Sequence, residues 1–277
     1  KNRFLIYNDE MKDKTWSYIQ LSSDLRSALQ NEEFFLVYQP VYSINTGKLD
    51  GFEALIRWKH PEKGIVYPLE FIPFAEEMGL IEKIEDWVLE TACRQSSEWQ
   101  SRGNSDLRIA INISGKALSR EEWIRKAENH LSDCTDYSRI ILEITETAII
   151  NDIEDSVKAL EIIHDMGIQI ALDDFGTGYS SLTNLQRLPI DIIKLDKSFV
   201  WSIGSNDNKS IIVQAVIDLA HNLGMEVVAE GVETLEQLEF LERSGCDYAQ
   251  GYYFSKPVEA DAVYGILDSA FYPKSQK

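Results

Sequence analysis

After Trp58, the sequence alternates short β-branched runs with helical stretches of about 10 to 18 residues. This alternation indicates successive βαβ units, because a helix must carry the chain back before the next parallel strand can begin. Several of the helices are expected to end in a glycine, which adopts the left-handed C-terminal cap without strain. These glycines are Gly103, Gly167, Gly224 and Gly245. The pattern predicts an α/β fold with mainly parallel strands.

Eight strands are expected. The first two are FFLVYQP (34–40) and GFEALIRW (51–58), and the turn between them is too short for a crossover helix, so they should run antiparallel. The other six are RIAINIS (108–114), IILEITE (140–146), IQIALDD (168–174), IDIIKLD (190–196), MEVVAEG (225–231) and DYAQGYYF (247–254). Eight strands close a β/α barrel around a filled interior. We therefore expect a TIM-like (β/α)8 barrel whose first strand is antiparallel to the rest.

Charge and cysteine content narrow the possible partners. The chain has 46 acidic and 27 basic residues, a formal net charge of -19, which should repel long nucleic acids. No apolar run approaches the roughly 18 residues of a membrane span, so we expect no membrane contact by this segment. Three distant cysteines suggest neither a disulfide framework nor a thiolate zinc site. A cytoplasmic location is expected for this domain, even if the full-length protein has a membrane anchor.

The chain is expected to have three parts. Residues 1–30 form a junction segment and an amphipathic helix (16–31), which leads into the first strand. Residues 31–270 form the barrel domain, and residues 271–277 form a C-terminal tail. Because the first residue is Lys and no signal peptide follows, we expect the segment to come from a longer chain.

Polar residues occur at or near the end of every expected strand. A strand buried on both sides should not carry a charge unless that charge is paired or bound to a metal. Any one of these residues alone could be a solvated loop residue or a satisfied core residue. As a set they predict an active site, because β/α barrels build their sites from strand C-terminal ends. The set is Gln39, Glu53, Asn112, Glu143, Asp173, Asp174, Lys194, Asp196, Glu230 and Gln250.

Carboxylate and amide oxygens are hard ligands, which suit magnesium or manganese. The adjacent Asp173 and Asp174 are suited to serve two ions, and a pair of ions favours hydrolysis of a phosphodiester. Lys194 is expected to position a water or hold a phosphate oxygen, or else to form a simple salt bridge to Asp196 or Asp173. The four histidines lack ligand-like spacing. For His164 and His221, inside predicted helices, a packed or surface role is expected.

Eight motifs resemble the EAL-domain phosphodiesterases, which cleave cyclic dimeric GMP (cyclic di-GMP) to the linear dinucleotide pGpG. The resemblance covers nearly the whole chain from about Asp24. The motifs are YQP (38–40), EALIRW (53–58), FIPFAEEMGLI (71–81), LEITET (142–147), LDDFGTGYSSL (172–182), LPIDIIKLDKSFV (188–200), VVAEGVET (227–234) and QGYYFSKP (250–257). Together they are highly specific, although a three-letter EAL alone would carry no information.

The resemblance also implies roles for individual residues. It implies Mg²⁺ or Mn²⁺, with two ions expected. Ligands of the first ion are Glu53, Asn112, Glu143 and Asp173; Asp173 and Asp174 serve the second, with Glu230 as a further ligand or the general base. The implied catalytic residues are Glu53, Lys194 and Glu230, where Lys194 orients the water. The implied substrate contacts are Gln39, Leu55, Arg57, Asp196, Glu233 and Gln250.

A loop from Asp174 to Leu182 resembles the family's mobile loop, which supports metal binding and couples to dimerisation. Its implied regulatory residues are Phe175, Gly176, Thr177 and Gly178, anchored by Glu146. The chain departs from the family where Ser114, Gly115, Lys116 and Ala117 replace a Ser-Pro-x-Gln pattern, which removes no ligand. A homodimer is implied. The first residues resemble the segment that follows a GGDEF domain, so an upstream GGDEF or sensor domain is expected.

Two other functions remain open from the sequence. One is a catalytically silent receptor that binds cyclic di-GMP, although such proteins usually lack a ligand or loop residue that this chain retains. The other is an unrelated metal-dependent barrel, such as an enolising enzyme or a lyase, because an acidic cluster with a lysine also suits proton abstraction. The combined motifs favour the phosphodiesterase.

Overall fold

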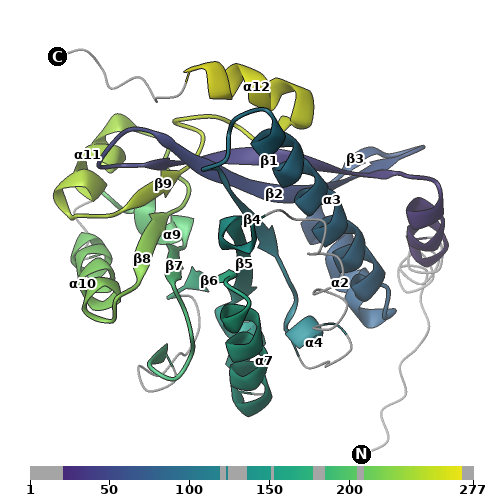
Figure 1. The fold of residues 1–277 in the computed structure, drawn as a ribbon, viewed down its shortest axis with the longest axis horizontal. Coiled ribbons are helices and arrows are strands. Elements are labelled where there is room, and N and C mark those ends of the chain that lie inside the picture. Colours follow the sequence, from purple (N-terminus) through teal and green to yellow (C-terminus); the bar gives the residue numbers. More distant parts are fainter. Residues whose placement is uncertain are drawn as a thin grey trace, which may run out of the picture. The chain divides into compact units, whose positions relative to one another are not determined.

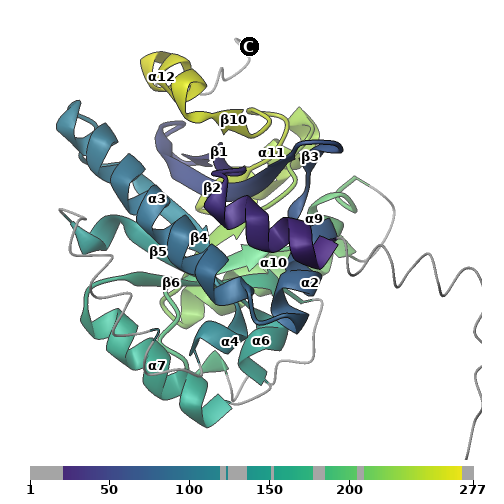
Figure 2. The same ribbon diagram turned by 90° about the vertical axis from the view of Figure 1, so that its right-hand side faces the viewer.

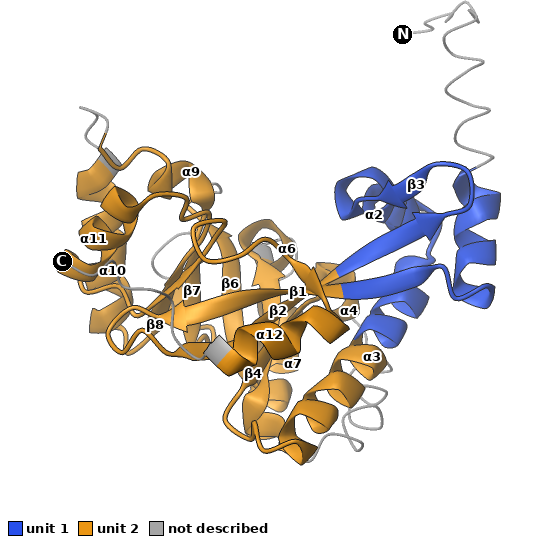
Figure 3. Ribbon diagram, turned by 90° about the horizontal axis from the view of Figure 1, so that it is seen from above, with its two compact units in different colours: residues 1–36, 56–88 blue, residues 37–55, 89–277 orange. Residues whose placement is uncertain are grey.

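The computed structural model describes residues 21–118, 123, 136–150, 153–176, 185–204 and 209–269. The chain divides into two compact units, coloured separately in Figure 3. Unit 1 comprises Lys1–Leu36 and Ile56–Val88, and unit 2 comprises Val37–Leu55 and Leu89–Lys277. Each unit is described by itself below.

Unit 2 contains the barrel. Its strands are β1 (Phe34–Ser43) from Val37 onward, β2 (Leu49–His60) as far as Leu55, β4 (Arg108–Asn112), β5 (Ile140–Thr145), β6 (Gln169–Phe175), β7 (Ile192–Leu195), β8 (Glu226–Ala229) and β9 (Tyr248–Gln250). They follow the order β1-β9-β8-β7-β6-β5-β4-β2, and pairing of β1 with β2 closes the ring. Neighbours from β2 to β9 are parallel, whereas β1 runs antiparallel to β9. The predicted barrel with a reversed first strand is confirmed.

Several strands end earlier than the sequence predicted. Strand β4 ends at Asn112 and not at Ser114, and Glu146 begins a helix instead of ending β5. Likewise, Asp196 and Glu230 follow their strands. Two short strands were not predicted: β3 (Gly64–Val66), paired with β2, and β10 (Val258–Glu259), paired with β1.

Helices cover the outside of the barrel strands. Figures 1 and 2 show α7 (Ile153–Asp165) and α10 (Lys209–Asn222) outside the strands, where α7 contacts β6 and α10 contacts β8. The other helical elements are α2 (Pro68–Glu77), α3 (Ile81–Ser101), α4 (Gly115–Leu118), η1 (Tyr137–Arg139), α6 (Glu146–Ile150), α9 (Lys197–Val200), α11 (Leu235–Arg243) and α12 (Ala260–Ser269). No helix in the described ranges combines the length and apolar character needed to span a bilayer.

The predicted helix ends are also confirmed. The four glycines that follow α3, α7, α10 and α11 all have positive φ angles between 77° and 94°. A side chain would strain the backbone there, so these glycines fix where each helix turns toward the next strand.

The barrel interior is apolar in the middle and polar at both ends. Side chains at even spacing along a strand face the same side. Along β4, Arg108 and Asn112 therefore share the inner face with Ala110, which packs in the core cluster. The core cluster comprises Val41, Ala110, Ile141, Ala171, Ile192 and Val228. This arrangement leaves separate polar groups at the two ends of the strands.

Unit 1 has its own aromatic core. The rings of Trp58 and Phe71 pack around Phe34 at centroid distances of 5.9 and 5.6 Å. Residues 21–30 are helical, and Asp24 from this helix lies 3.3 Å from His60. The predicted helix at residues 16–31 is therefore found in its described part, while residues 16–20 lie outside the described residues. The limits proposed for the barrel domain, 31–270, stay a prediction.

Candidate active site

A buried lysine lies at the centre of the candidate site. Lys194, on β7, is 2% exposed, and its Nζ lies 2.7 Å from Glu143 Oε2 and 2.7 Å from Glu230 Oε1. The same nitrogen lies 3.5 Å from Asp173 Oδ1 and 3.6 Å from Glu53 Oε2. We call these five residues the Lys194 cluster. They come from β2, β5, β6, β7 and the residue after β8, so the barrel brings together the side chains that the sequence predicted to converge.

The Lys194 cluster has more negative than positive charge. Burial raises the pKa of Glu143 well above its usual value, and the charge of Glu53 raises it further. Burial also raises the pKa of Glu230 to about 7, despite the opposing charge of Lys194. For Lys194, burial lowers the pKa, but the carboxylates of Asp173 and Glu143 outweigh it, so the net pKa is well above normal. The lysine stays charged, and in the cation-free protein Glu143 and Glu230 hold their protons more tightly than free carboxyl groups do, which relieves part of the excess negative charge.

Two amides hold Glu53 in place. Asn112 donates from Nδ2 to Glu53 Oε1 at 2.8 Å, and Gln250 donates from Nε2 to Glu53 Oε2 at 2.6 Å. Burial disfavours the charge on Glu53, but Lys194 and these amides lower its pKa below the usual value. Gln39 accepts from Gln250 at 3.1 Å and donates to the carbonyl of Ser255 at 3.3 Å. The sequence did not indicate Ser255, because a carbonyl contact leaves no side-chain signal.

Gln250 also has an unused acceptor. Its Oε1 atom is buried, and the described part of the chain provides no hydrogen-bond donor to it. A buried acceptor of this kind costs free energy unless a ligand, ion or water satisfies it. The atom therefore indicates that the site is built to receive another group.

A second group of carboxylates lies beside Lys194. Asp173, Asp174 and Glu230 each offer an oxygen, and these oxygens lie within 4.8 Å of one another. Consecutive residues of a regular strand point to opposite faces, but the pairing of β6 with β7 shifts register between Leu172 and Phe175. Such a bulge re-aims a side chain, which explains how two neighbouring aspartates share one group. Asp174 also has a positive φ of 55°, a strained conformation typical of functional sites.

The start of the loop after β6 is held by Glu146. Glu146 begins α6, is 2% exposed, and accepts from the backbone N–H of Gly176 at 3.2 Å. Gly176 has a φ of 94°, and a Cβ there would lie 2.8 Å from the Phe199 ring, so the position requires glycine. Phe175 is buried. Thr177 and Gly178 lie outside the described residues, and the regulatory role of the loop stays a prediction.

The other residues predicted to contact the substrate have different local environments. Asp196 caps α9 by accepting from Ser198 N at 3.0 Å, and the side chain of Glu233 is exposed. Leu55 is half-buried, two residues after Glu53. Arg57 belongs to unit 1, where its guanidinium lies 5.2 Å from the Tyr67 ring centroid. Their roles as substrate contacts stay predictions.

Of the two salt bridges considered for Lys194, the one to Asp173 forms at 3.5 Å. It is one of four ion pairs of Lys194, and the pairs with Glu143 and Glu230 are shorter. Asp196 is not among the ion-pair partners found in the described residues, because the chain turns at Asp196 and its carboxylate begins the next helix. Strand-end spacing therefore predicted the members of the Lys194 cluster but not their pairing.

The residues after β4 that depart from the family pattern, Ser114 to Ala117, have a local packing role. A Cβ at Gly115 would lie 2.8 Å from the Cβ and the carbonyl oxygen of Ala148, so glycine allows α4 to approach α6 closely. None of the predicted metal ligands lies at Ser114 to Ala117. Gly115 therefore affects how α4 packs against α6, the helix whose first residue is Glu146.

Comparisons with known proteins agree on one family. The sequence profile described as "EAL domain" matches residues 22–257. The chain is 38% identical over 264 residues to the "Bifunctional diguanylate cyclase/cyclic di-GMP phosphodiesterase MucR" of Pseudomonas aeruginosa, covering 95% of this chain and 38% of that relative. It is 37% identical over 263 residues to the "Cyclic di-GMP phosphodiesterase PdeR" of Escherichia coli, covering 95% of this chain and 40% of the relative.

The fold comparison gives the same result. The solved structure described as "PaMucR Phosphodiesterase, c-di-GMP complex" is similar with a TM-score of 0.85 and 40% identity, covering 88% of this chain and 99% of that chain. The chain spans less than half the length of the curated relatives named above.

Proposed function

The chain belongs to the EAL domain family, and on that premise we propose that it hydrolyses cyclic di-GMP to linear pGpG at the Lys194 cluster. The carrying observation is a buried ammonium within 3.6 Å of four carboxylates at the C-terminal ends of the barrel strands. Barrel enzymes have their active sites at this end. The names of MucR and PdeR, together with the solved PaMucR complex with c-di-GMP, support this substrate.

Two divalent cations, Mg²⁺ or Mn²⁺, fit these residues. The candidate ligands are all oxygen atoms, the preferred donors for both ions, and the site has an excess of negative charge. We propose that Glu53, Asn112, Glu143 and Asp173 hold one ion, and that Asp173, Asp174 and Glu230 hold the other. Bound there, the ions would supply Lewis-acid activation of water and neutralise charge on the phosphate.

The side chains have separate proposed roles in catalysis. Glu230 is the proposed general base, because its carboxylate lies 2.7 Å from Lys194 and its oxygen lies within 4.8 Å of those of Asp173 and Asp174, where a cation-bound water would lie. Lys194 is proposed to orient the attacking water through its Nζ, since its donors already point toward the carboxylates around that position. Glu53 is fixed for its role by Asn112 and Gln250.

The proposed reaction opens the ring of the substrate. Water attacks one phosphorus, Glu230 takes a proton from that water, and the bond from phosphorus to the 3′-oxygen breaks. The 3′-oxygen leaves with a proton as a hydroxyl, so the product is a linear dinucleotide with a 5′-phosphate. We propose that the substrate is held by Gln39, Leu55, Arg57, Asp196, Glu233 and Gln250, where the Arg57 guanidinium suits a phosphate.

A direct test is incubation of the purified chain with cyclic di-GMP and Mn²⁺, followed by chromatography for pGpG. We expect pGpG to form, and to stop forming when a chelator removes the cation. Glu53→Ala is the matched negative control, because it removes one carboxylate from the site. Lack of product from the unaltered chain with either cation would contradict the proposal.

The receptor remains the competing function, and the same sample distinguishes it. Isothermal titration calorimetry with cyclic di-GMP measures binding whether or not cleavage follows, if Ca²⁺ replaces Mn²⁺ to slow turnover. Binding without any product in Mn²⁺ would establish a receptor. The complete set of carboxylates around Lys194 favours the enzyme.

We also propose a homodimer and an upstream GGDEF or sensor domain in the natural protein. The relatives support further domains, because the chain spans only 38% of MucR and 40% of PdeR. We also propose a cytoplasmic location for this domain, where buried thiols such as those of Cys93 and Cys246 stay reduced.

A further inference from the structure

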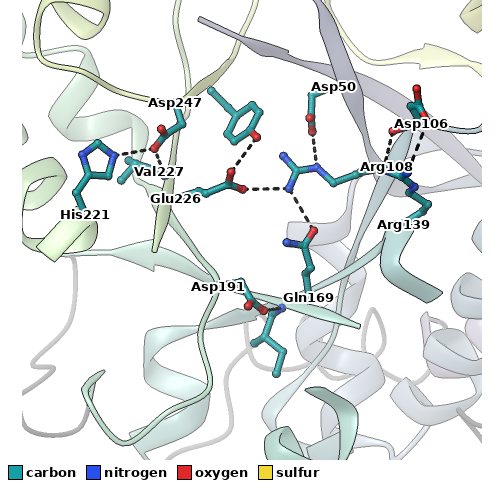
Figure 4. A network of polar contacts seen from close by, with 12 residues as sticks. Asp50, Asp106, Arg108, Arg139, Gln169, Asp191, His221, Glu226, Val227 and Asp247 are labelled. Carbon is teal, nitrogen blue, oxygen red and sulfur yellow. Dashed lines mark hydrogen bonds and ion pairs between the residues drawn. The ribbon is translucent and has the colours of Figure 1, made fainter. Parts of the chain in front are cut away.

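A second polar network lies at the opposite end of the barrel, where the strands begin (Figure 4). Its centre is Arg108, the first residue of β4, with a side chain that is 10% exposed. Arg108 donates from Nε to Asp50 Oδ2 at 2.7 Å, and from Nη1 to Gln169 Oε1 and Glu226 Oε2, both at 3.2 Å. Its guanidinium lies 4.6 Å from the Tyr248 ring centroid. We call these five residues the floor network.

The floor network joins strands that are not neighbours. Gln169 begins β6, Glu226 begins β8, and Asp50 lies near the start of β2. In the ring order, β8 lies opposite β4, and β6 lies halfway between them. Because Arg108 reaches all three from β4, one side chain links the starts of the alternate strands β4, β6 and β8, and also that of β2, which pairs with β4 directly. Backbone hydrogen bonds join only adjacent strands, so they do not link β4 to β6 or to β8.

The same strands carry the candidate site at their other ends. Three of the floor residues lie four positions before a site residue; the pairs are Arg108 and Asn112, Gln169 and Asp173, and Glu226 and Glu230. Four residues of strand span about 13 Å and return the side chain to the same face. A shift of one residue in any strand would turn its site residue to the other face. The register at the floor therefore decides which side chains enter the site.

The interior between the two ends does not fix that register alone. A cavity there is lined by the small side chains of Ala110 and Ala171, and by Arg108, Glu143 and Lys194 among others. Tightly packed side chains would resist sliding of one strand past another, but a cavity provides fewer such contacts. The directional hydrogen bonds of Arg108 supply a further constraint on the register, in addition to the packing of the core cluster.

Two His–Asp pairs add outer links at the same level. His164 Nε2 lies 3.2 Å from Asp191 Oδ1, and Asp191 Oδ2 accepts from the backbone N–H of Ile170 at 2.8 Å. The second pair repeats this pattern, because His221 Nε2 lies 2.9 Å from Asp247 Oδ2, which accepts from Val227 N. Each pair therefore links the end of a helix to the strand that follows it. These polar contacts give His164 and His221 a structural role that the sequence did not specify.

The sequence shows that this unit occurs twice. Asp173 is nine residues after His164, and Glu230 is nine residues after His221. In both segments a glycine follows the histidine after three residues, and the floor residue, Gln169 or Glu226, follows after five. The same spacing thus connects a floor residue with a site carboxylate in β6 and in β8.

We propose that Arg108 is a positioning residue for the candidate site. By linking the starts of β4, β6 and β8, it fixes the positions of Asn112, Asp173 and Glu230 along the barrel axis. The inference rests on the proposed function, because the affected property is cation binding at that site. It goes further by assigning a role in that function to the opposite end of the barrel.

The test changes one link of Arg108 and leaves the others in place. Gln169→Met keeps a similar side-chain size but removes the acceptor for Arg108, whereas Gln169→Glu restores an acceptor. We expect Gln169→Met to raise the Kd for Mn²⁺, measured by isothermal titration calorimetry, by about tenfold, and Gln169→Glu to bring it back toward the original value. Arg108→Lys, which keeps the charge but loses the planar fork, should give a similar or larger increase.

A matched control separates positioning from loss of stability. Leu160 is fully buried on α7 and belongs to neither polar network, so Leu160→Ala should lower the melting temperature through a cavity. We expect this control to keep the Kd for Mn²⁺ unchanged even if it is less stable than Gln169→Met. The inference is overturned if the Kd follows the melting temperature across all variants, or if folded Gln169→Met binds Mn²⁺ normally.

The two proposals fail in different ways. If the unaltered chain binds Mn²⁺ but forms no pGpG, the proposed function fails, while the comparison of Kd values still decides the role of Arg108. If the unaltered chain binds neither Mn²⁺ nor Mg²⁺, there is no cation site to position, and the inference is overturned as well.

Discussion

The two polar ends of the barrel each surround one buried cation, but their charges differ. Arg108 faces two carboxylates, an amide oxygen and an aromatic ring, and its Nε and Nη1 atoms donate within the network. Lys194 faces four carboxyl groups within 3.6 Å, twice as many as Arg108, and two of them have raised pKa values in the cation-free protein. The network with fewer carboxyl groups per cation supports the fold, whereas the one with more suits the binding of another positive charge. The comparison shows how similar residue types can build a support at one end and a binding site at the other.

Substitutions at the two ends should separate activity from stability, with the largest effect at Glu53. We expect Glu53→Ala to reduce kcat/KM for cyclic di-GMP by at least about 10³-fold, because it removes a proposed cation ligand. The fold should remain largely intact, since Glu53 lines the site and not the apolar core. The matched floor variant, Asp50→Asn, should lower the melting temperature but keep kcat/KM within about tenfold. Normal turnover by Glu53→Ala would contradict the assignment of the first ion.

The pH dependence of stability should also distinguish the two ends. The folded-state pKa of Glu230 is raised from 4.5 to about 7, so the folded protein binds this proton more tightly than the unfolded chain. Its contribution to stability is therefore greatest below pH 4.5 and is lost as the pH rises to about 7. In chelator, Glu230→Gln should gain up to about 3 kcal/mol over the unaltered chain between pH 5 and pH 8.

Urea unfolding at several pH values measures this difference. Gln169→Met provides the matched floor control, because it removes a floor contact but no ionisable group. Its stability relative to the unaltered chain should change much less over the same range. A difference between Glu230→Gln and the unaltered chain that does not depend on pH would show that Glu230 is not a high-pKa carboxyl in the cation-free protein.

The sequence predicted the site better than its supports. Strand-end residues such as Glu53 and Lys194 could be predicted because a charged residue inside an apolar run must be paired or bound to a ligand. The same argument applied to Arg108 and Glu226, but they occur at strand starts, where a solvated residue is the ordinary expectation. Their partners come from strands far apart in sequence, so the network became recognisable only once the barrel was closed. The bulge that turns Asp174 toward Asp173 depends on pairing with β7 and has no signal in the local sequence.

Divalent cations should stabilise the protein through the Lys194 end alone. A ligand present at about 100 times its Kd adds about 2.7 kcal/mol to the free energy of unfolding. For a chain of this size, Mn²⁺ should then raise the melting temperature by roughly 5 to 10 °C. The increase should be much smaller in Glu53→Ala and unchanged in Leu160→Ala. Equal increases in all three proteins would place the bound cation elsewhere.

The smallest expected effects concern the outer His–Asp pairs. His164 and His221 are about half-exposed, so losing either hydrogen bond should cost about 1 kcal/mol or less of unfolding free energy. The Kd for Mn²⁺ should change less than twofold in His164→Ala and in His221→Ala, because Arg108 still holds Gln169 and Glu226 from the inside. Since the two pairs have the same spacing and similar geometry, the two variants should lose similar stability. A large change in Mn²⁺ affinity in either variant would move the positioning role from Arg108 to the helix ends.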